Sequence, residues 1–70
     1  MGIILSEHTK KRMKERSVKM EQIRECLDFP DYRISKGEKV EFFKKFENHT
    51  LRLVCVEKNI FIKVVTLMWK

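Results

Sequence analysis

The 70-residue chain has few of the residues that mark special architectures. Two glycines and one proline exclude a collagen-like or low-complexity chain, since both depend on a high content of such residues. No apolar run approaches the roughly 20 residues of a membrane-spanning helix, and the opening residues lack the cationic leader of a signal peptide. We therefore expect a cytoplasmic protein that has no membrane partner.

Cysteine and histidine, the residues most used in metal sites, occur only twice each. Cys26 lies in a helical pattern and Cys55 in a strand pattern, both among apolar neighbours, as is typical of buried thiols. His8 and His49 are not spaced to complete a zinc site with them. The sequence predicts no disulfide, no metal site and no cofactor.

Acidic residues are the scarcer charge. Sixteen Lys and Arg against 10 Asp and Glu give a net charge of +6, which favours a polyanionic partner, nucleic acid ahead of a membrane surface. The content of 43% hydrophobic and 37% charged residues is typical of a globular chain, and the length allows one domain, residues 1–70. A core of this size supplies only about 3–5 kcal/mol, so a homodimer or a bound partner stays an alternative.

Two helices are predicted in the first part of the chain. Ser6 is the expected N-cap of a helix from Glu7 to about Arg16. A second helix, from about Met20 to Leu27, has a normal buried spacing of apolar residues on one face, and Pro30 marks its end.

After Pro30 the hydrophobic period changes to two, which predicts strands over residues 31–36, 39–47, 50–57 and 60–69. Asn48-His49 and Lys58-Asn59 are expected as tight hairpin turns. The predicted fold is α+β, with two N-terminal helices packed on one face of a four-stranded, mainly antiparallel sheet. The element order is α-α-β-β-β-β.

The two hairpins also predict which side chains share a face, because they place Phe46 opposite Leu51 and Cys55 opposite Ile62. The expected core side carries Val40, Phe42, Phe46, Leu51, Leu53, Cys55, Ile60, Ile62, Val64 and Met68, with Lys44 as its one charge. The expected opposite side carries Glu41, Phe43, Lys45, Arg52, Val54, Val56, Phe61, Lys63, Val65, Leu67 and Trp69.

This opposite side mixes cations with aromatic rings. Lys45, Arg52 and Lys63 are expected near its centre, and its rings are those of Phe43, Phe61 and Trp69. Such a surface suits RNA, because rings stack on bases while Lys and Arg contact phosphates. A surface that binds a second copy or a protein partner has a similar composition, so that alternative stays open.

A ridge of three side chains is predicted on the first helix. His8, Arg12 and Arg16 are four residues apart, so they stack about 6 Å apart along the helix axis. Imidazole is the usual proton shuttle near neutral pH, and guanidinium groups bind phosphate, so we interpret the ridge as functional and half-buried. Lys10 and Lys11 are further candidates for nucleic-acid binding, although such a basic run is also typical of a solvated helix face.

Several motifs then resemble a known family. They are Ile-Leu-Ser-Glu-His at residues 4–8, His8-x3-Arg12-Met13-x2-Arg16, Ile23-x2-Cys26-Leu27-x2-Pro30, the strands 51–56 and 62–66, and the terminal Trp69-Lys70. In this order the chain is similar, over nearly its whole length, to the small prokaryotic family catalogued as domain of unknown function 4258. Ser17-Val18-Lys19 departs from the family's usual Gly-Ile-Ser, which removes a serine cap from the second helix.

The resemblance implies a fold related to RelE-type and barnase-like ribonucleases. That wider group includes toxins of toxin–antitoxin pairs, which cleave RNA without a metal, so an antitoxin-like partner is implied as well. Its basic groups act from the sheet surface turned away from the helices, where we expect Lys45, Arg52 and Lys63. This implication is an analogy between folds.

The main hypothesis is therefore a metal-independent endoribonuclease, in which a ribose 2′-hydroxyl attacks the adjacent phosphodiester. Arg52 and Lys63 would stabilise charge, His8 would shuttle a proton, and Arg12 and Arg16 would position phosphate. Glu41 is a candidate base only if it approaches the same pocket. The helix ridge and the sheet cations meet only if the ridge reaches round a sheet edge. A non-catalytic RNA-binding or protein-partner module is the alternative.

Overall fold

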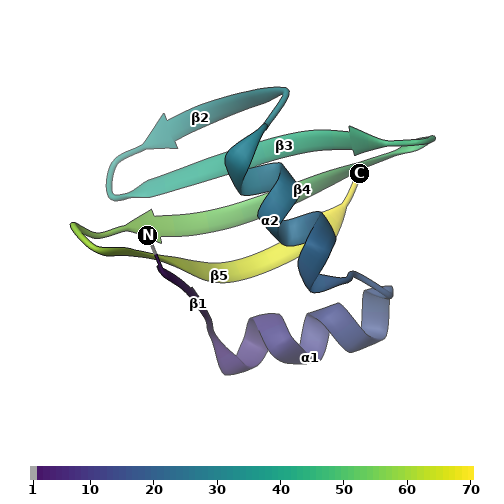
Figure 1. The fold of residues 1–70 in the computed structure, drawn as a ribbon, viewed down its shortest axis with the longest axis horizontal. Coiled ribbons are helices and arrows are strands. Elements are labelled where there is room, and N and C mark those ends of the chain that lie inside the picture. The colour runs from purple at the N-terminus through teal and green to yellow at the C-terminus, as the bar shows by residue number, and fades with distance from the viewer. Residues whose placement is uncertain (1) are drawn as a thin grey trace.

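The computed structural model describes residues 2–70, in which five strands form one sheet with the order β1-β5-β4-β3-β2 (Figure 1). In chain order the elements are β1 (Gly2–Leu5), α1 (Glu7–Arg16), α2 (Met20–Asp28), β2 (Tyr32–Lys36), β3 (Lys39–Phe46), β4 (His49–Glu57) and β5 (Phe61–Trp69). Met1, the first residue of the predicted domain 1–70, lies outside the described residues. The α+β class and the two helices are as the sequence predicts.

The helix ends follow from local hydrogen bonds. Ser6 is the N-cap of α1, and its hydroxyl accepts from the backbone N–H of Thr9 at 3.0 Å. Ser17 ends α1 in the left-handed region at φ 54°. Lys19 has no side-chain acceptor, but the side chain of Gln22 accepts from its backbone N–H at 2.9 Å. This contact supports the start of α2, whose N-cap residue has no acceptor side chain.

The sheet has one strand more than the sequence predicts. Gly2–Leu5 forms β1, which pairs in parallel with the start of β5, with Leu5 opposite Val64. The sheet is therefore mixed, and the prediction of four strands is wrong in this detail. A segment of four residues carries too little periodicity to identify a strand, and its partner lies about sixty residues further along the chain.

The hairpin between β3 and β4 is shifted from its predicted register. Its turn residues are Glu47 and Asn48, with Glu47 at φ 57°, so Phe46 lies opposite His49 and not Leu51. The shift amounts to two residues. Because side chains alternate with a period of two, every residue of β4 keeps its predicted face.

The hairpin between β4 and β5 differs more strongly from its predicted pairing. Glu57 lies opposite Ile62, which again shifts the register by two residues and leaves Ile60 exposed in the turn instead of in the core. A β-bulge follows, because Val54 pairs with Thr66 whereas Cys55 pairs with Val64, so Val65 is the extra residue.

The bulge exchanges the two faces for the end of β5. Leu67 lies opposite Leu53 and is fully buried, and Trp69 lies opposite Leu51 and packs against the core. Met68 lies opposite Arg52 on the other face. The predicted outward positions of Leu67 and Trp69, and the predicted core position of Met68, are therefore wrong.

The hydrophobic core lies between the sheet and the helices. α2 crosses β3 and β4 and buries Ile23 and Cys26 completely against them (Figure 1). The predicted core residues Val40, Phe42, Leu51, Leu53, Cys55, Ile62 and Val64 are confirmed as buried. Lys44, the one charge predicted on this side, donates from its Nζ to the backbone oxygen of Phe29 at 2.9 Å.

Beyond the end of β1, helix α1 continues along the same edge of β5. The N–H of Ser6 donates to the backbone oxygen of Val64, and the Ser6 hydroxyl donates to that of Val65 at 2.9 Å. The buried Thr9 hydroxyl also donates to the Val64 oxygen, at 2.7 Å. These bonds hold α1 along the sheet edge and not over the middle of the sheet (Figure 1).

Candidate functional site

One face of the sheet carries no helix among the described residues, and we call it the open face. Its cations are Lys36, Lys39, Lys45, Arg52 and Lys63, and the Nζ of Lys70 reaches over it. Glu41 is the one carboxylate on the strands of this face within residues 2–70. This one surface therefore carries most of the net positive charge of +6.

A two-point ion pair occupies the middle of the open face. Arg52 Nε donates to Glu41 Oε1 at 3.0 Å, and Arg52 Nη2 lies 2.9 Å from Glu41 Oε2. The Nζ of Lys36 lies 3.5 Å from the same Oε2 atom. The hydrogen bond from Arg52 holds the pKa of Glu41 below its ordinary value, and the bond to Glu41 raises the pKa of Arg52. Both groups are charged at neutral pH.

Tyr32 is the aromatic ring that the open face offers to a ligand. Its ring stacks on that of Phe43, with centroids 4.4 Å apart and planes 11° apart, and Tyr32 is 50% exposed. Phe43 is only 3% exposed, because Tyr32 covers one side and the Nζ of Lys70 lies 5.3 Å from its centroid. Sequence reasoning missed Tyr32, although a tight turn at residues 37–38 would have placed it opposite Phe43.

The other two predicted rings are less suited to stacking there. Phe61 lies at the start of β5, on the open-face side and half-buried beside Gly2. Trp69 lies on the helix-bearing side, where its Nε1 donates to the backbone oxygen of Arg16 at 2.9 Å. The predicted place of Trp69 in the aromatic surface is therefore wrong, because the bulge at Val65 turns this residue to the opposite face.

The three predicted sheet cations share the open face but do not form one cluster. Lys45 lies opposite Thr50 and Lys63 opposite Val56, so six residues of β4 separate them, about 20 Å at the usual strand rise. Arg52 lies between them, about 13 Å along the strand from the position of Lys63. Lys45 and Lys63 are exposed, whereas the side chain of Arg52 is 24% exposed.

The ridge on α1 forms as its spacing predicts. Arg12 Nε donates to His8 Nε2 at 3.3 Å. Arg12 is half-buried, as expected, whereas His8 and Arg16 are exposed.

The ridge faces the same way as the open face. Thr9 points at β5, and Lys10 and Lys14 flank the helix on the side of α2. The 100° step of an α-helix then places the ridge on the opposite flank, toward the open face. The ridge thus lies on the flank of α1 away from α2, and no hydrogen bond or ion pair within residues 2–70 joins it to Glu41 or Arg52.

The remaining candidates lie elsewhere. Lys10 is exposed on α1, with its Nζ 3.5 Å from Glu7, and Lys11 is exposed beside it. Both cysteines are buried and free, and burial raises the pKa of each thiol to about 12, so neither is a nucleophile at neutral pH. Residues 2–70 contain no group of three or more His, Cys, Asp or Glu side chains that could hold a metal ion.

The described helices are too short and too polar to span a bilayer. Comparison with curated proteins and with solved structures finds no match to the chain. A family model does match, over residues 5–69. The match includes the ridge on α1 and every strand of the open face except most of β1, and the chain belongs to the family described as Domain of unknown function (DUF4258).

Proposed function

We propose that this protein acts on RNA and that a single strand of RNA lies across the open face. The observation that carries the proposal is the charge of that face, which has six basic side chains, Lys36, Lys39, Lys45, Arg52, Lys63 and Lys70, against one carboxylate. That carboxylate, Glu41, is already paired. Most of these cations are thus free to neutralise phosphates, which is the main source of affinity for nucleic acids.

The spread of the cations and the position of Tyr32 favour a single strand. Lys45 and Lys63, about 20 Å apart along the sheet, would contact different phosphates of a strand several nucleotides long. Tyr32 is half-exposed at an edge strand, where an unpaired base can stack on its ring. The bases of a duplex are already stacked on one another and cannot use this ring.

A second candidate function is cleavage without a metal ion, and the Glu41–Arg52 pair favours it. Glu41 would accept the proton of a ribose 2′-hydroxyl while the 2′-oxygen attacks the adjacent phosphorus. The 5′-oxygen would leave with a proton from water, giving a 2′,3′-cyclic phosphate and a 5′-hydroxyl. His8 lies on α1, outside β5 and two strands from Glu41, so it is too far away to supply this proton. Arg52 would neutralise the charge that develops on the phosphorane. The lowered pKa makes Glu41 a weak base, so this reaction would be slow.

The expected relation to RelE-type and barnase-like ribonucleases agrees with cleavage and would add an antitoxin-like protein partner. Lys63 has a different role in this proposal from the one that the sequence led us to expect. Because it lies about 13 Å along the sheet from Arg52, it would bind a neighbouring phosphate of the strand and not the reacting one.

Binding is tested with a fluorescein-labelled 12-nucleotide uridine oligomer in chelator, measured by fluorescence anisotropy between 50 and 200 mM salt. The double variant Lys45→Ala/Lys63→Ala should bind several-fold more weakly, with a salt slope smaller by about 0.7 for each lost phosphate contact. Lys10→Ala/Lys11→Ala removes the same charge from α1 and is the matched control. Equal losses in both variants would show that RNA does not lie on the open face.

Cleavage is tested with the same oligomer and gel analysis, comparing the natural chain with Glu41→Gln, Arg52→Ala and His8→Ala. Fragments ending in a cyclic phosphate, made in chelator and lost in Glu41→Gln and Arg52→Ala, would establish the nuclease, whereas loss in His8→Ala as well would show that the ridge takes part. Intact RNA that is bound by a folded protein would reject cleavage and leave RNA binding as the function.

A further inference from the structure

A groove lies beside α1 on the covered side of the sheet, lined by residues of α1, by Leu5 of β1 and by the linker from α1 to α2. α1 packs against β5 and α2 packs against β3 and β4, so the space between the helices has no cover of its own. The groove has a volume of about 810 Å³. Its deepest lining residues are apolar: Val18 is buried, and Leu5 and Met13 are half-buried.

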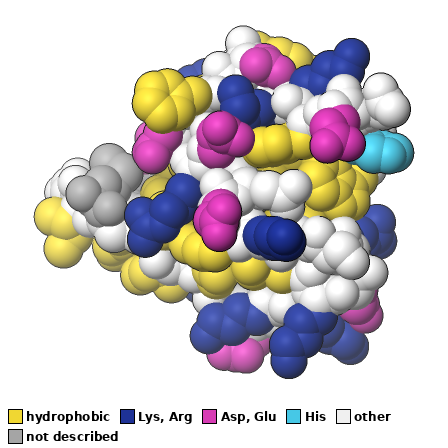
Figure 2. Space-filling model, turned by 45° about the vertical axis from the view of Figure 1, so that its right-hand side comes forward, with side chains coloured by type: hydrophobic (Ala, Val, Ile, Leu, Met, Phe, Trp, Pro, Cys, Tyr) yellow, Lys and Arg dark blue, Asp and Glu magenta, His cyan; other side chains and the backbone are white. Residues whose placement is uncertain are grey.

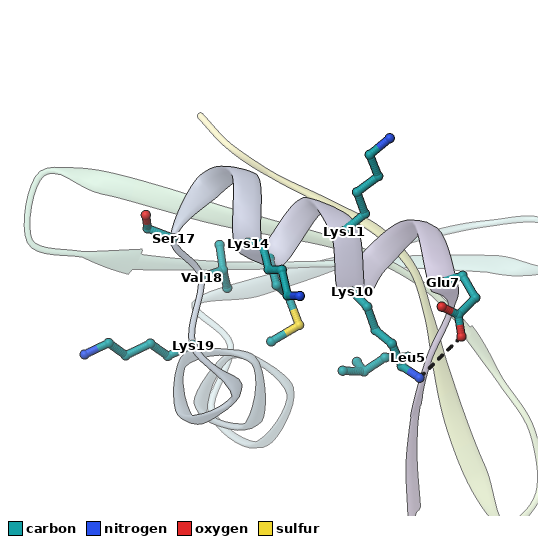
Figure 3. A pocket seen from close by; sticks show the side chains of 9 residues that line it. Leu5, Glu7, Lys10, Lys11, Lys14, Ser17, Val18 and Lys19 are labelled. Atoms are coloured by element: carbon teal, nitrogen blue, oxygen red, sulfur yellow. Dashed lines mark hydrogen bonds and ion pairs between the residues drawn. The ribbon is translucent and has the colours of Figure 1, made fainter.

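The rim of this groove is basic. Figure 3 shows Lys10 and Lys14 extending from α1 on the side of the groove, whereas Lys11 points away from the groove. Glu7 is the one carboxylate among the lining residues, and it already lies 3.5 Å from the Nζ of Lys10. In the oblique view of Figure 2, hydrophobic side chains stay uncovered between basic ones on this side of the molecule. The groove therefore combines an apolar base with an excess of positive charge.

We propose that this groove binds an acidic amphipathic helix of a partner protein. Such a helix has apolar side chains at positions i, i+3, i+4 and i+7, which would reach Leu5, Met13 and Val18, and its flanking carboxylates would pair with Lys10 and Lys14. α1 has ten residues and is about 15 Å long, which matches about three turns of a partner helix. This proposal does not depend on RNA binding, because the groove and the open face lie on different sides of the sheet.

The lining residues exclude other occupants. They contain no aromatic ring, so a nucleic-acid base would have no surface to stack on. A bilayer is flat and does not reach into a concave site, whereas the side chains of a helix do. A second copy of the chain offers α2 as its acidic helix, but its apolar side chains are already used: Ile23 and Cys26 are buried against its own sheet, and Met20 and Leu27 pack against the same core.

The test uses a labelled 18-residue model peptide with leucines at the stated helical spacing and glutamates on the flanks. We expect saturable binding by fluorescence anisotropy, and about tenfold weaker binding to Lys10→Glu/Lys14→Glu. The matched control Lys45→Glu/Lys63→Glu changes the same charge on the open face and should bind the peptide within about twofold of the natural chain. Circular dichroism shows whether each variant is folded.

Two further peptides separate the parts of the proposal. A peptide with serine in place of leucine keeps the charge and should lose binding, and one with lysine in place of glutamate should also fail to bind. Phosphatidylglycerol vesicles and the uridine oligomer are offered as competitors, and neither should displace the peptide. Absence of peptide binding to the folded natural chain, equal affinity of both double variants, or displacement by vesicles or RNA would overturn the proposal.

Discussion

Glu41 and Arg52 are diagonal neighbours on adjacent strands, and their side chains make two N···O contacts, of 2.9 and 3.0 Å. Val54, and not Arg52, lies directly opposite Glu41 in the register. Long side chains bridge such diagonal positions in antiparallel sheets. The pair leaves Glu41 only 6% exposed, although no helix covers this face in residues 2–70. A charged group is thus shielded by its partner and its strand neighbours alone.

Glu41→Gln should lower the free energy of unfolding at pH 7 by about 1–3 kcal/mol, because Arg52 loses its charged partner. The folded pKa of Glu41 lies below its ordinary value of 4.5. Its stabilisation is therefore fully present above about pH 4.5 and is lost as the pH falls through the folded pKa. Urea unfolding of both proteins at pH 7, 4 and 3 measures this as a difference that shrinks in acid.

The exposed pair Arg33–Glu57 supplies the comparison for that experiment. Its side chains are 48% and 38% exposed, so Glu57→Gln should change stability by no more than about 1 kcal/mol. A stability difference for Glu41→Gln that is the same at every pH would contradict the assignment of the effect to the Glu41 carboxylate.

Thr9→Val should destabilise the protein by about 1–3 kcal/mol without changing its shape, because the buried oxygen of Val64 loses a hydroxyl donor. Thermal unfolding followed by circular dichroism measures the loss. Thr66→Val, on the open face and half-buried, makes the same chemical change and should cost less than about 0.5 kcal/mol. Equal effects of the two substitutions would mean that the bond between α1 and β5 is unimportant.

Tyr32→Leu should weaken binding of the uridine oligomer by at least about fivefold, since stacking contributes about 1–3 kcal/mol per base. Leucine keeps a cover over Phe43. Trp69→Phe should leave the affinity within about twofold, because Trp69 contacts Arg16 on the helix-bearing side. Anisotropy titrations check both variants, and the reverse order of effects would show that RNA approaches from the helices.

Deletion of Val65 should abolish cooperative folding. Without the extra residue, either Leu67 and Trp69 turn away from the core or the pairing with β1 and β4 is lost. Val65→Ala keeps the number of residues in β5 and should unfold cooperatively, with a modest loss of stability. Thermal unfolding and the dispersion of amide proton signals compare the two proteins. A well-dispersed spectrum for the deletion variant would mean that the bulge is dispensable.

Much of this fold could be predicted because its signals are local. Ser6 and the apolar spacing of residues 20–27 identify the helices, and the alternation after Pro30 identifies β2 to β5. Both hairpin registers were wrong by two residues, but an even shift does not exchange the faces. Lys45, Arg52 and Lys63 therefore lie on the expected side.

What could not be predicted depends on distant contacts. The pairing of β1 with β5 joins opposite ends of the chain, and nothing in the sequence of residues 2–5 indicates that β5 is the pairing strand. The bulge at Val65 has no glycine or other turn residue beside it, so a strand pattern extends through it. The position of Trp69 followed from that extension and was wrong. The separation of Lys45 from Lys63 likewise needed the true register.

The placement of α1 beside β5 has a further consequence for how copies of this protein meet in concentrated solution. A free strand edge invites pairing with another chain, which is the first step toward fibrils. Ser6 and Thr9 occupy the carbonyl oxygens of Val64 and Val65, so this stretch of the border offers no acceptors to an intruding polypeptide. Edge-to-edge polymerisation would therefore have to begin at one of the two outer strands, β1 or β2. These strands have only four and five residues, and short edge strands resist such pairing.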